Sequence, residues 1–194
     1  MQAGKSSIQF EHPPIITSAA SIVGQTEGEG PLASFFDRVE PDPMFGKKSW
    51  EEAESELQRQ TVQKCLDKAG RQAADVNCLF AGDLLGQIVA TSFGVESFDI
   101  PFFGLYGACS TMAESLLLAA MSVSGGYART ALAMTSSHFA SSERQYRFPL
   151  GYGGQRTPTA QWTVTGAGAL LLTSEGEGPY VTHVTTGRIR DAGV

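Results

Sequence analysis

The stretch from Ile100 to Met121 constrains what this chain can fold into more than any other. It opens on a short apolar and aromatic run that predicts a buried strand, and glycines that follow allow a tight turn. A helix comes next, in which leucine, alanine and methionine are so frequent that we expect it to be buried on nearly every side. Cys109 falls at the start of this helix, where backbone N–H groups and the helix dipole favour a thiolate. We therefore expect a buried cysteine that acts as a nucleophile or belongs to an anion site.

Cys109 also has a plainer interpretation, because a free cysteine in apolar surroundings is usually a small core residue. The spacing of its neighbours excludes one enzyme class. The nucleophile elbow of an α/β-hydrolase needs glycine two residues before and two residues after the nucleophile. Gly107 meets the first condition, but Thr111 stands where the second glycine should be. A cysteine hydrolase of that kind is therefore not expected.

Composition narrows the class of protein. The 194 residues are 42% hydrophobic, which is enough for one well-packed domain. A net charge of −6 and an isoelectric point of about 5.0 argue against nucleic-acid binding. The three cysteines form no CxxC pair, which indicates reduced thiols and predicts no metal site and no cofactor. The first residues lack the apolar core of a signal peptide, and no apolar run is long enough to span a membrane. We expect a protein that is not secreted and that contacts membranes only peripherally.

The order of apolar and polar segments predicts an α/β fold. We expect a polar arm over residues 1–14, a helix from Ser49 to Gly70 with Glu52 completing a capping box, and a second helix over 84–93. Residues 139–161, which carry several arginines and tyrosines, are predicted to be a long loop, and 175–179 a hairpin turn. The predicted strands are 15–23, 75–82, 100–103, 129–135, 162–173 and 180–186. This order gives a βαβαβαββ unit with a mixed, mostly parallel sheet covered by helices.

Polar residues follow two of these strands directly. Asp83 follows the predicted strand 75–82, and Ser136, Ser137 and His138 follow the predicted strand 129–135. The carboxyl ends of parallel strands form the edge at which open α/β sheets bind ligands. Hydroxyl groups there, together with the helix start at Ser110, suit a carboxylate ligand. Asp83 would repel a bare dianion but could hold a calcium ion that accompanies one. Two plainer alternatives stay open: Asp83 can cap a helix, and the serines can be an ordinary polar strand exit.

Several motifs resemble a known family. Gly-Ala-Cys-Ser at 107–110 resembles the nucleophile turn of the thiolase and ketoacyl-synthase fold, and the Gly-Ala-Gly-Ala strand at 166–169 is similar to a signature of its N-terminal half. Glu-Arg-Gln-Tyr-Arg-Phe-Pro at 143–149 and Gly-Gln-Arg-Thr-Pro-Thr-Ala-Gln-Trp at 154–162 resemble the stage V sporulation protein AD family more specifically.

That resemblance implies a five-layer αβαβα fold of two similar halves, of which residues 15–194 would be the N-terminal half. Thiolase-type enzymes take their catalytic histidine and asparagine, or second histidine, from the other half, and the histidines of this chain match none of those motifs. The sporulation family is described as binding dipicolinic acid and helping to load it into developing spores with membrane-embedded stage V sporulation proteins. The implied location is the developing spore, beside the inner spore membrane, and the implied assembly is a homodimer through the thiolase-type interface.

Three functions follow as hypotheses. The first is non-enzymatic binding of dipicolinic acid, alone or with calcium. The second is acyl transfer through a Cys109 thioester, against which stands the absence of a matching base and oxyanion-hole histidine. The third is an interaction module in which the Arg/Tyr-rich loop docks onto a membrane complex or a second copy of the fold, and it is compatible with the first. The first hypothesis assigns no catalytic residue, and its ligand-binding residues are Asp83, Cys109, Ser110, Ser136, Ser137 and His138.

Overall fold

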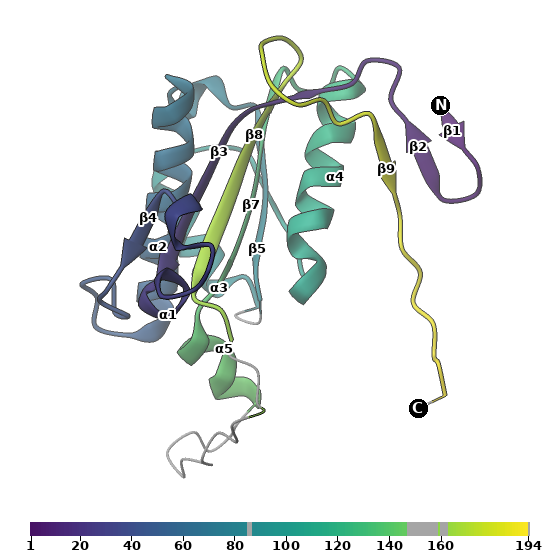
Figure 1. The fold of residues 1–194 in the computed structure, drawn as a ribbon. Helices are drawn as coiled ribbons and strands as arrows, with labels where there is room; N and C mark the ends of the chain where they lie inside the picture. The colour runs from purple at the N-terminus through teal and green to yellow at the C-terminus, as the bar shows by residue number, and fades with distance from the viewer. Residues whose placement is uncertain (85–86, 147–158, 160–162, 194) are drawn as a thin grey trace.

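The computed structural model describes residues 1–84, 87–146, 159 and 163–193. Its centre is a six-stranded sheet in the order β4-β3-β8-β7-β5-β6 (Figure 1). Strand β8 runs antiparallel to both of its neighbours, while the remaining pairs are parallel. The mixed, mostly parallel sheet expected from the sequence is therefore confirmed. The strands are β3 (Ile15–Gly24), β4 (Arg38–Glu40), β5 (Cys78–Asp83), β6 (Phe102–Gly104), β7 (Thr130–Ser137) and β8 (Gly166–Thr173).

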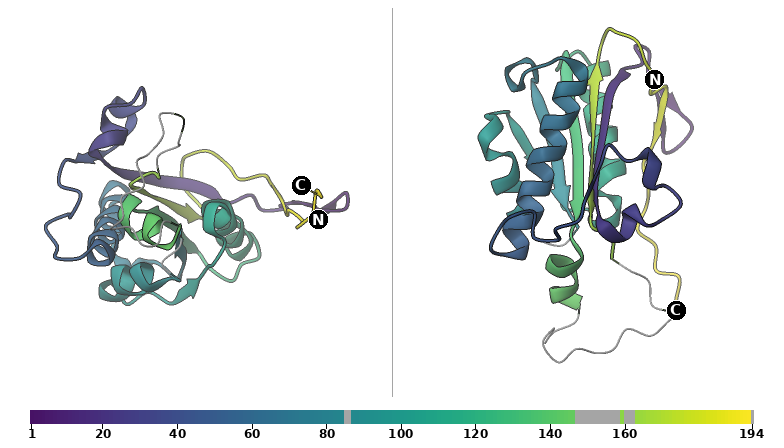
Figure 2. Two further views of the ribbon diagram at one scale, coloured as in Figure 1. Left: turned by 90° about the horizontal axis from the view of Figure 1, so that it is seen from below. Right: turned by 60° about the vertical axis from the view of Figure 1, so that its left-hand side comes forward.

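Helices cover both faces of this sheet, as Figures 1 and 2 show. Helices α2 and α3 lie on one face, which we call the α2 face, and α4 lies on the other, the α4 face. Helix α5 continues from the end of β7 beyond the sheet edge. The helices are α1 (Gln25–Gly28), α2 (Trp50–Ala69), α3 (Val89–Val95), α4 (Thr111–Ser124) and α5 (Phe139–Tyr146), with short 3-10 turns at Ala33–Phe35, Ala73–Asp75, Glu96–Phe98 and Ala108–Ser110.

The core follows from the alternation of side chains along the strands. In β5, Leu79 packs on the α2 face and Phe80 on the α4 face. In β7, Leu132 and Met134 belong to the α2 face, whereas Ala133 belongs to the α4 face. The alternation fixes which face each later residue of a strand takes, and this decides the arrangement of the candidate site.

Helix α2 begins and ends where its sequence predicts. The hydroxyl of Ser49 accepts from the backbone N–H of Glu52, and the Glu52 carboxylate accepts from the N–H of Ser49, which completes the capping box. Gly70 ends the helix in the left-handed conformation with φ 62°, which glycine adopts without steric cost.

The prediction that 162–173 and 180–186 form a hairpin is wrong. The second strand, β9 (His183–Thr185), pairs with β2 (Ser7–Gln9), and β2 also pairs with β1 (Gln2–Ala3) in a separate antiparallel sheet. The polar arm is therefore partly ordered as strands. Phe10, which directly follows β2, is buried against the α4 side of the core and anchors this small sheet.

Two further differences concern helices. Helix α3 begins at Val89, five positions later than predicted, after residues 85–86, which lie outside the described part. Helix α5 occupies the first part of the predicted long loop. The remainder of that loop falls mostly on residues 147–158 and 160–162, which also lie outside the described residues.

Candidate functional site

The turn that carries Cys109 connects β6 to α4. It is a 3-10 turn over Ala108–Ser110, and α4 begins at the next residue. Ala108 has a left-handed backbone with φ 48°, which residues with a Cβ adopt infrequently. Ser110 Oγ donates to the carbonyl oxygen of Gly107 across 2.8 Å and closes the turn. A strained turn held by its own hydrogen bond is a feature that clusters at functional sites.

Cys109 is exposed, so the expectation of a buried cysteine is wrong. The buried stripe of α4 passes through Thr111, Ser115 and Ala119, and Cys109 precedes this stripe by two residues, which takes it out of the helical repeat. Ser110 is exposed as well. The helix is not buried on every side either, because Met121 on its outer side is 39% exposed.

The position of this turn depends on Gly82 at the end of β5. The carbonyl of Ala81 accepts from the N–H of Leu105 across 2.8 Å, so the chain before the turn lies directly against β5. A Cβ at position 82 would lie 2.2 Å from the carbonyl oxygen of Leu105 and 2.9 Å from Thr111 Cγ2. Only glycine, which has no Cβ, allows this approach. The start of α4 can therefore lie against β5 only because position 82 is a glycine.

Cys109 opens onto a cavity of about 320 Å³ on the α4 face of the sheet. Ser137 lines this cavity, and its hydroxyl donates to the carbonyl oxygen of Val164 across 2.7 Å. Gly168 leaves open space, since a Cβ there would meet no atom within 4 Å. Within the described part of the chain, Cys109 is the one titratable side chain among the lining residues, which are Ser21, Val23, Phe36, Leu84, Ala108, Cys109, Met112, Thr135, Ser136, Ser137, Val164, Gly166, Ala167 and Gly168.

The structure divides the six residues predicted to bind the ligand between the two faces of the sheet. Cys109, Ser110 and Ser137 belong to the α4 side. Asp83 and Ser136 have their side chains on the α2 face, because they continue the alternation that puts Leu79 and Met134 there. Ser136 reaches the Cys109 cavity as part of its wall, but its hydroxyl is bonded to residues of α2.

His138 is fully buried at 0% exposure and its ring is committed to local contacts. Its Nδ1 accepts from the N–H of Ala140 across 3.2 Å, so Nε2 carries the hydrogen and donates to the carbonyl oxygen of Pro43 across 2.8 Å. The ring packs 5.4 Å from that of Trp50. Burial lowers the pKa of His138, which keeps the imidazole neutral. His138 is therefore a structural residue on the α2 face of the sheet.

The predicted residues on the α2 face belong to a buried polar network. Gln58 Nε2 donates to Thr91 Oγ1 at 3.1 Å and to Ser136 Oγ at 2.5 Å. Thr91 Oγ1 donates to Asp83 Oδ2 across 2.7 Å, and Ser136 Oγ donates to Glu54 Oε1 across the same distance. The side-chain amide of Gln58 thus donates to two hydroxyl groups, each of which donates to a carboxyl group. Thr91 connects Gln58 to Asp83, and Ser136 connects it to Glu54.

Neither carboxyl group of the network has a cationic partner among the described residues. Glu54 is 1% exposed and Asp83 is 3% exposed. Burial, together with the negative charges of Asp83 and Glu51, raises the pKa of Glu54 to about 7 against the lowering effect of the hydrogen bonds from Ser141 and Ser136. Asp83 Oδ1 and Gln58 Oε1 are buried and have no hydrogen-bond partner among the described residues.

Sequence reasoning missed Glu54 and Gln58. The signal was present, because both residues fall on the stripe that Leu57, Val62 and Cys65 mark as buried along α2. Polar residues on such a stripe must find hydrogen bonds within the fold. Nothing in the sequence indicates that their partners come from the ends of β5 and β7.

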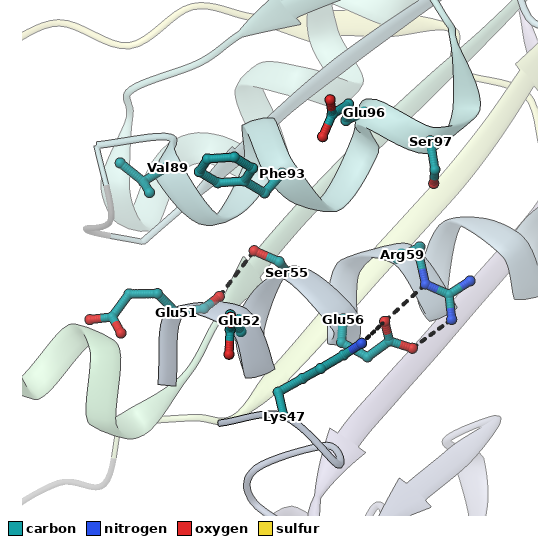
Figure 3. A pocket seen from close by; sticks show the side chains of 10 residues that line it. All are labelled: Lys47, Glu51, Glu52, Ser55, Glu56, Arg59, Val89, Phe93, Glu96 and Ser97. Carbon is teal, nitrogen blue, oxygen red and sulfur yellow. Dashed lines mark hydrogen bonds and ion pairs between the residues drawn. The ribbon is translucent and has the colours of Figure 1, made fainter. Parts of the chain in front are cut away.

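A second cavity, of about 680 Å³, lies between α2 and α3 (Figure 3). Lys47 and Arg59 both point to Glu56 there, with Lys47 Nζ 3.3 Å and Arg59 Nη2 2.5 Å from its oxygens. The hydrogen bond from Arg59, with that from Lys47, lowers the pKa of Glu56 to about 2 despite partial burial. Phe93 is 69% exposed at the rim. This groove is larger than the Cys109 cavity, but its described lining residues include no cysteine and no histidine.

The described residues form no group of three histidine, cysteine or carboxylate side chains that could hold a metal ion. Asp83 is the residue for which the sequence leaves calcium binding open, and its side chain lies on the face of the sheet opposite Cys109. Among the same residues, no helix combines the length and the apolar character needed to cross a membrane.

Sequence comparison connects the chain to one family. The family described as Stage V sporulation protein AD (SpoVAD) matches residues 4–194. The chain is 41% identical to the stage V sporulation protein AD of Bacillus subtilis (strain 168) over 191 residues, which are 98% of this chain and 56% of that protein. The chain thus spans about half the length of the curated relative it matches.

Solved structures show the fold. AbyA1, a tetronic acid condensing enzyme, has a TM-score of 0.58 at 18% identity over 86% of this chain and 56% of its own. The 3-oxoacyl-[acyl-carrier-protein] synthase III of Aquifex aeolicus VF5 has a TM-score of 0.54 at 14% identity over 84% and 55%. The priming β-ketosynthase of the R1128 polyketide pathway has a TM-score of 0.53 at 14% identity over 92% and 53%. At these identities the likeness establishes a thiolase-like α/β fold.

Proposed function

The chain belongs to the stage V sporulation protein AD family, and we propose that it binds dipicolinic acid, as its calcium chelate, without catalysing a reaction on it. The observation that carries this proposal is the lining of the Cys109 cavity. Its described side chains offer hydroxyl groups, a thiol and apolar surface, and they include no carboxylate, imidazole, ammonium or guanidinium group. Such a lining can hold a small ligand, but its described side chains supply no histidine or carboxylate as general acid or base.

The form of the ligand follows from the same lining. Free dipicolinate carries two carboxylates, and burying them without a countercharge costs far more than the hydroxyl bonds return. A one-to-one calcium chelate carries no net charge and still presents carboxylate oxygens to hydroxyl donors. The volume of about 320 Å³ is at the small end of the range for ligand sites, which suits a single-ring molecule.

Within this proposal Cys109 and Ser137 contact the ligand, while Asp83, Ser136 and His138 support the wall from the other face of the sheet. Ser137 Oγ can donate to the ligand only when its hydrogen turns away from the carbonyl oxygen of Val164, and the thiol of Cys109 is a weak hydrogen-bond donor. Ser110 stands beside Cys109 at the start of α4, but its hydroxyl is engaged with Gly107.

The test is a calorimetric titration of dipicolinate with and without calcium. We expect tighter binding with calcium, about tenfold weaker binding in Ser137→Ala, and a smaller loss in Cys109→Ala. Ser92→Ala, which removes an exposed hydroxyl on α3, is the matched control and should bind like the unaltered protein. Unchanged affinity in both site variants would place the ligand elsewhere.

One observation favours the alternative of acyl transfer, since an exposed cysteine at a strained helix start is accessible to an acyl donor. His138, which directly follows Ser137 in the sequence, is buried on the opposite face with both ring nitrogens bonded. Incubation with an acyl-CoA followed by intact-mass measurement separates the two functions. An acyl adduct on Cys109 that survives denaturation would refute the binding-only proposal.

We further propose that the protein works in the developing spore, beside the inner spore membrane and in contact with membrane-embedded stage V sporulation proteins, and that it forms a homodimer. Strand β6 supports the dimer, because it lies at an end of the strand order and its Phe103 is 55% exposed. Open strand edges with exposed aromatic side chains favour pairing with a second chain.

A further inference from the structure

The hydrogen bonds around Glu54 allow two arrangements. Glu54 Oε1 accepts from Ser136 Oγ across 2.7 Å, and Glu54 Oε2 accepts from Ser141 Oγ across 2.5 Å. Ser141 Oγ also lies 3.1 Å from the carbonyl oxygen of His138. A hydroxyl has a single hydrogen, so Ser141 donates fully to only one of these two acceptors.

The charged groups that face Glu54 are acidic. Asp83 approaches it from β5 and Glu51 from its own helix, and both disfavour the ionised carboxylate. Helix α5 contributes the buried Glu143, and the neighbouring imidazole of His138 is kept neutral by burial. The described residues of β7 and α3 in contact with the network provide hydroxyl groups and the backbone N–H of Thr91, none of which is charged. Two cations of this region, Lys47 before α2 and Arg59 on α2, are paired with Glu56 in the groove of Figure 3.

We propose that Glu54 is a proton-operated latch between α2 and the first turn of α5. When a proton from solvent binds Glu54 Oε2, this oxygen donates to Ser141 Oγ, and the hydrogen of Ser141 turns to the carbonyl oxygen of His138. When the proton leaves, Ser141 turns back and donates to the carboxylate.

Hydrogen-bond accounting selects the oxygen that takes the proton. Ser136 Oγ already accepts from Gln58 Nε2, and if it also accepted from Glu54 its own hydrogen would have no acceptor among the described residues. Ser141 does have a second acceptor in the His138 carbonyl. Protonation at Oε2 therefore leaves every hydroxyl hydrogen bonded, whereas protonation at Oε1 does not.

The two states differ in how firmly α5 is held. In the protonated state the carboxyl group is neutral and fully bonded in a dry site. In the ionised state Glu54 is a buried charge without a cationic partner among the described residues. Water stabilises this charge, and it reaches Glu54 when the first turn of α5 opens. The pKa of about 7, raised chiefly by burial, places this change near neutral pH. Because α5 continues from the strand that carries Ser137, the latch acts next to the Cys109 cavity.

Hydrogen exchange of the α5 amides between pH 5 and pH 8, corrected for the intrinsic pH dependence of exchange, tests the latch. We expect the opening equilibrium of α5 to rise roughly 100-fold and to level off above pH 7, the pKa of the closed state. Glu54→Gln, which mimics the neutral acid, should abolish the rise. Glu56→Gln is the matched control on the same helix and should keep it, because the pKa of Glu56 of about 2 leaves that group ionised throughout.

The carbon-13 shift of the Glu54 carboxyl gives a second, direct measurement. A midpoint near pH 7 that moves higher in Ser141→Ala, which removes a donor to the ionised form, supports the latch. A midpoint near the ordinary glutamate value overturns it. So does an equal rise of exchange in Glu54→Gln, or a rise that is uniform over the amides of α2 and α5, which would indicate global unfolding instead of a local latch.

Discussion

Ser136 Oγ donates to Glu54 Oε1 across 2.7 Å, although the two residues are 82 positions apart in the chain. This bond joins the second turn of α2 to the end of β7, on the face of the sheet opposite Cys109. It explains why a serine predicted to meet a ligand is instead a support of the wall. The bond also holds the carboxyl group of Glu54 in a buried position, where its ionisation opposes folding.

We predict that Glu54→Gln stabilises the protein at pH 8 and changes little at pH 5. The folded state raises the pKa of Glu54 from 4.5 to about 7, so its contribution to stability is complete below pH 4.5 and is lost as the pH rises toward 7. Removing the ionisable group should therefore raise the free energy of unfolding by about 2–3 kcal/mol at pH 8. Urea unfolding at both pH values measures the difference.

Glu56→Gln serves as the control with the opposite sign. Its hydrogen bonds to Arg59 and Lys47 lower the pKa of Glu56, so its ionised form stabilises the fold above pH 4.5. This variant should lose less than about 1 kcal/mol at pH 8, as expected for a partly exposed ion pair. A gain in Glu54→Gln that is the same at pH 5 and pH 8 would show that Glu54 titrates normally in the folded protein.

We predict that one thiol of the native protein reacts rapidly with a maleimide or aromatic disulfide reagent, and that it is Cys109. Cys109 is exposed, whereas Cys65 is 0% and Cys78 is 9% exposed. Burial also raises the pKa of both buried thiols, which lowers their thiolate fraction. Peptide mapping after brief labelling identifies the site. Cys109→Ala should remove the fast phase, and a fast phase that persists in that variant would contradict the placement of the turn.

Local sequence signals predicted the elements well where a single segment decides its own structure. The capping box at Ser49 and the left-handed Gly70 bound α2 as expected, and the apolar runs of β3, β5 and β7 became central strands. The antiparallel partner of β2 could not be predicted in this way. His183–Thr185 pairs with Ser7–Gln9 because the chain leaves the large sheet after β8, and no local pattern encodes that departure.

The candidate site was predicted only in part for a similar reason. The turn at Cys109 was found because glycines and the helix start are local signals. The assumption that Asp83, Ser136 and Ser137 meet at one point ignored the alternation of side chains along a strand. Adjacent residues of β7 point to opposite faces, so Ser136 bonds to Glu54 while Ser137 lines the cavity.

We predict that Gly82→Ala strongly destabilises the fold and that Gly168→Ala does not. Both glycines lie within central strands, and neither has a positive φ. A Cβ at Gly82 would lie 2.2 Å from a backbone oxygen, whereas a Cβ at Gly168 meets no atom within 4 Å. We expect a loss of about 1–3 kcal/mol for Gly82→Ala, measured as a lower midpoint of urea unfolding. Equal midpoints for the two variants would show that the approach of Leu105 to β5 is not tight in solution.

The last prediction concerns association through β6. This strand is at one end of the order β4-β3-β8-β7-β5-β6, and among the described residues its outer edge has no partner strand. Phe103 is 55% and Tyr106 68% exposed near this edge, and an exposed edge with aromatic side chains pairs readily with a second copy. We expect a concentration-dependent dimer in sedimentation experiments, with dissociation at least about tenfold easier in Phe103→Glu, because a charge at the edge opposes pairing. Phe35→Glu is the matched control, since Phe35 is 78% exposed but precedes β4 at the other edge of the sheet. If both variants weaken the dimer equally, general surface hydrophobicity drives association and β6 is not the interface.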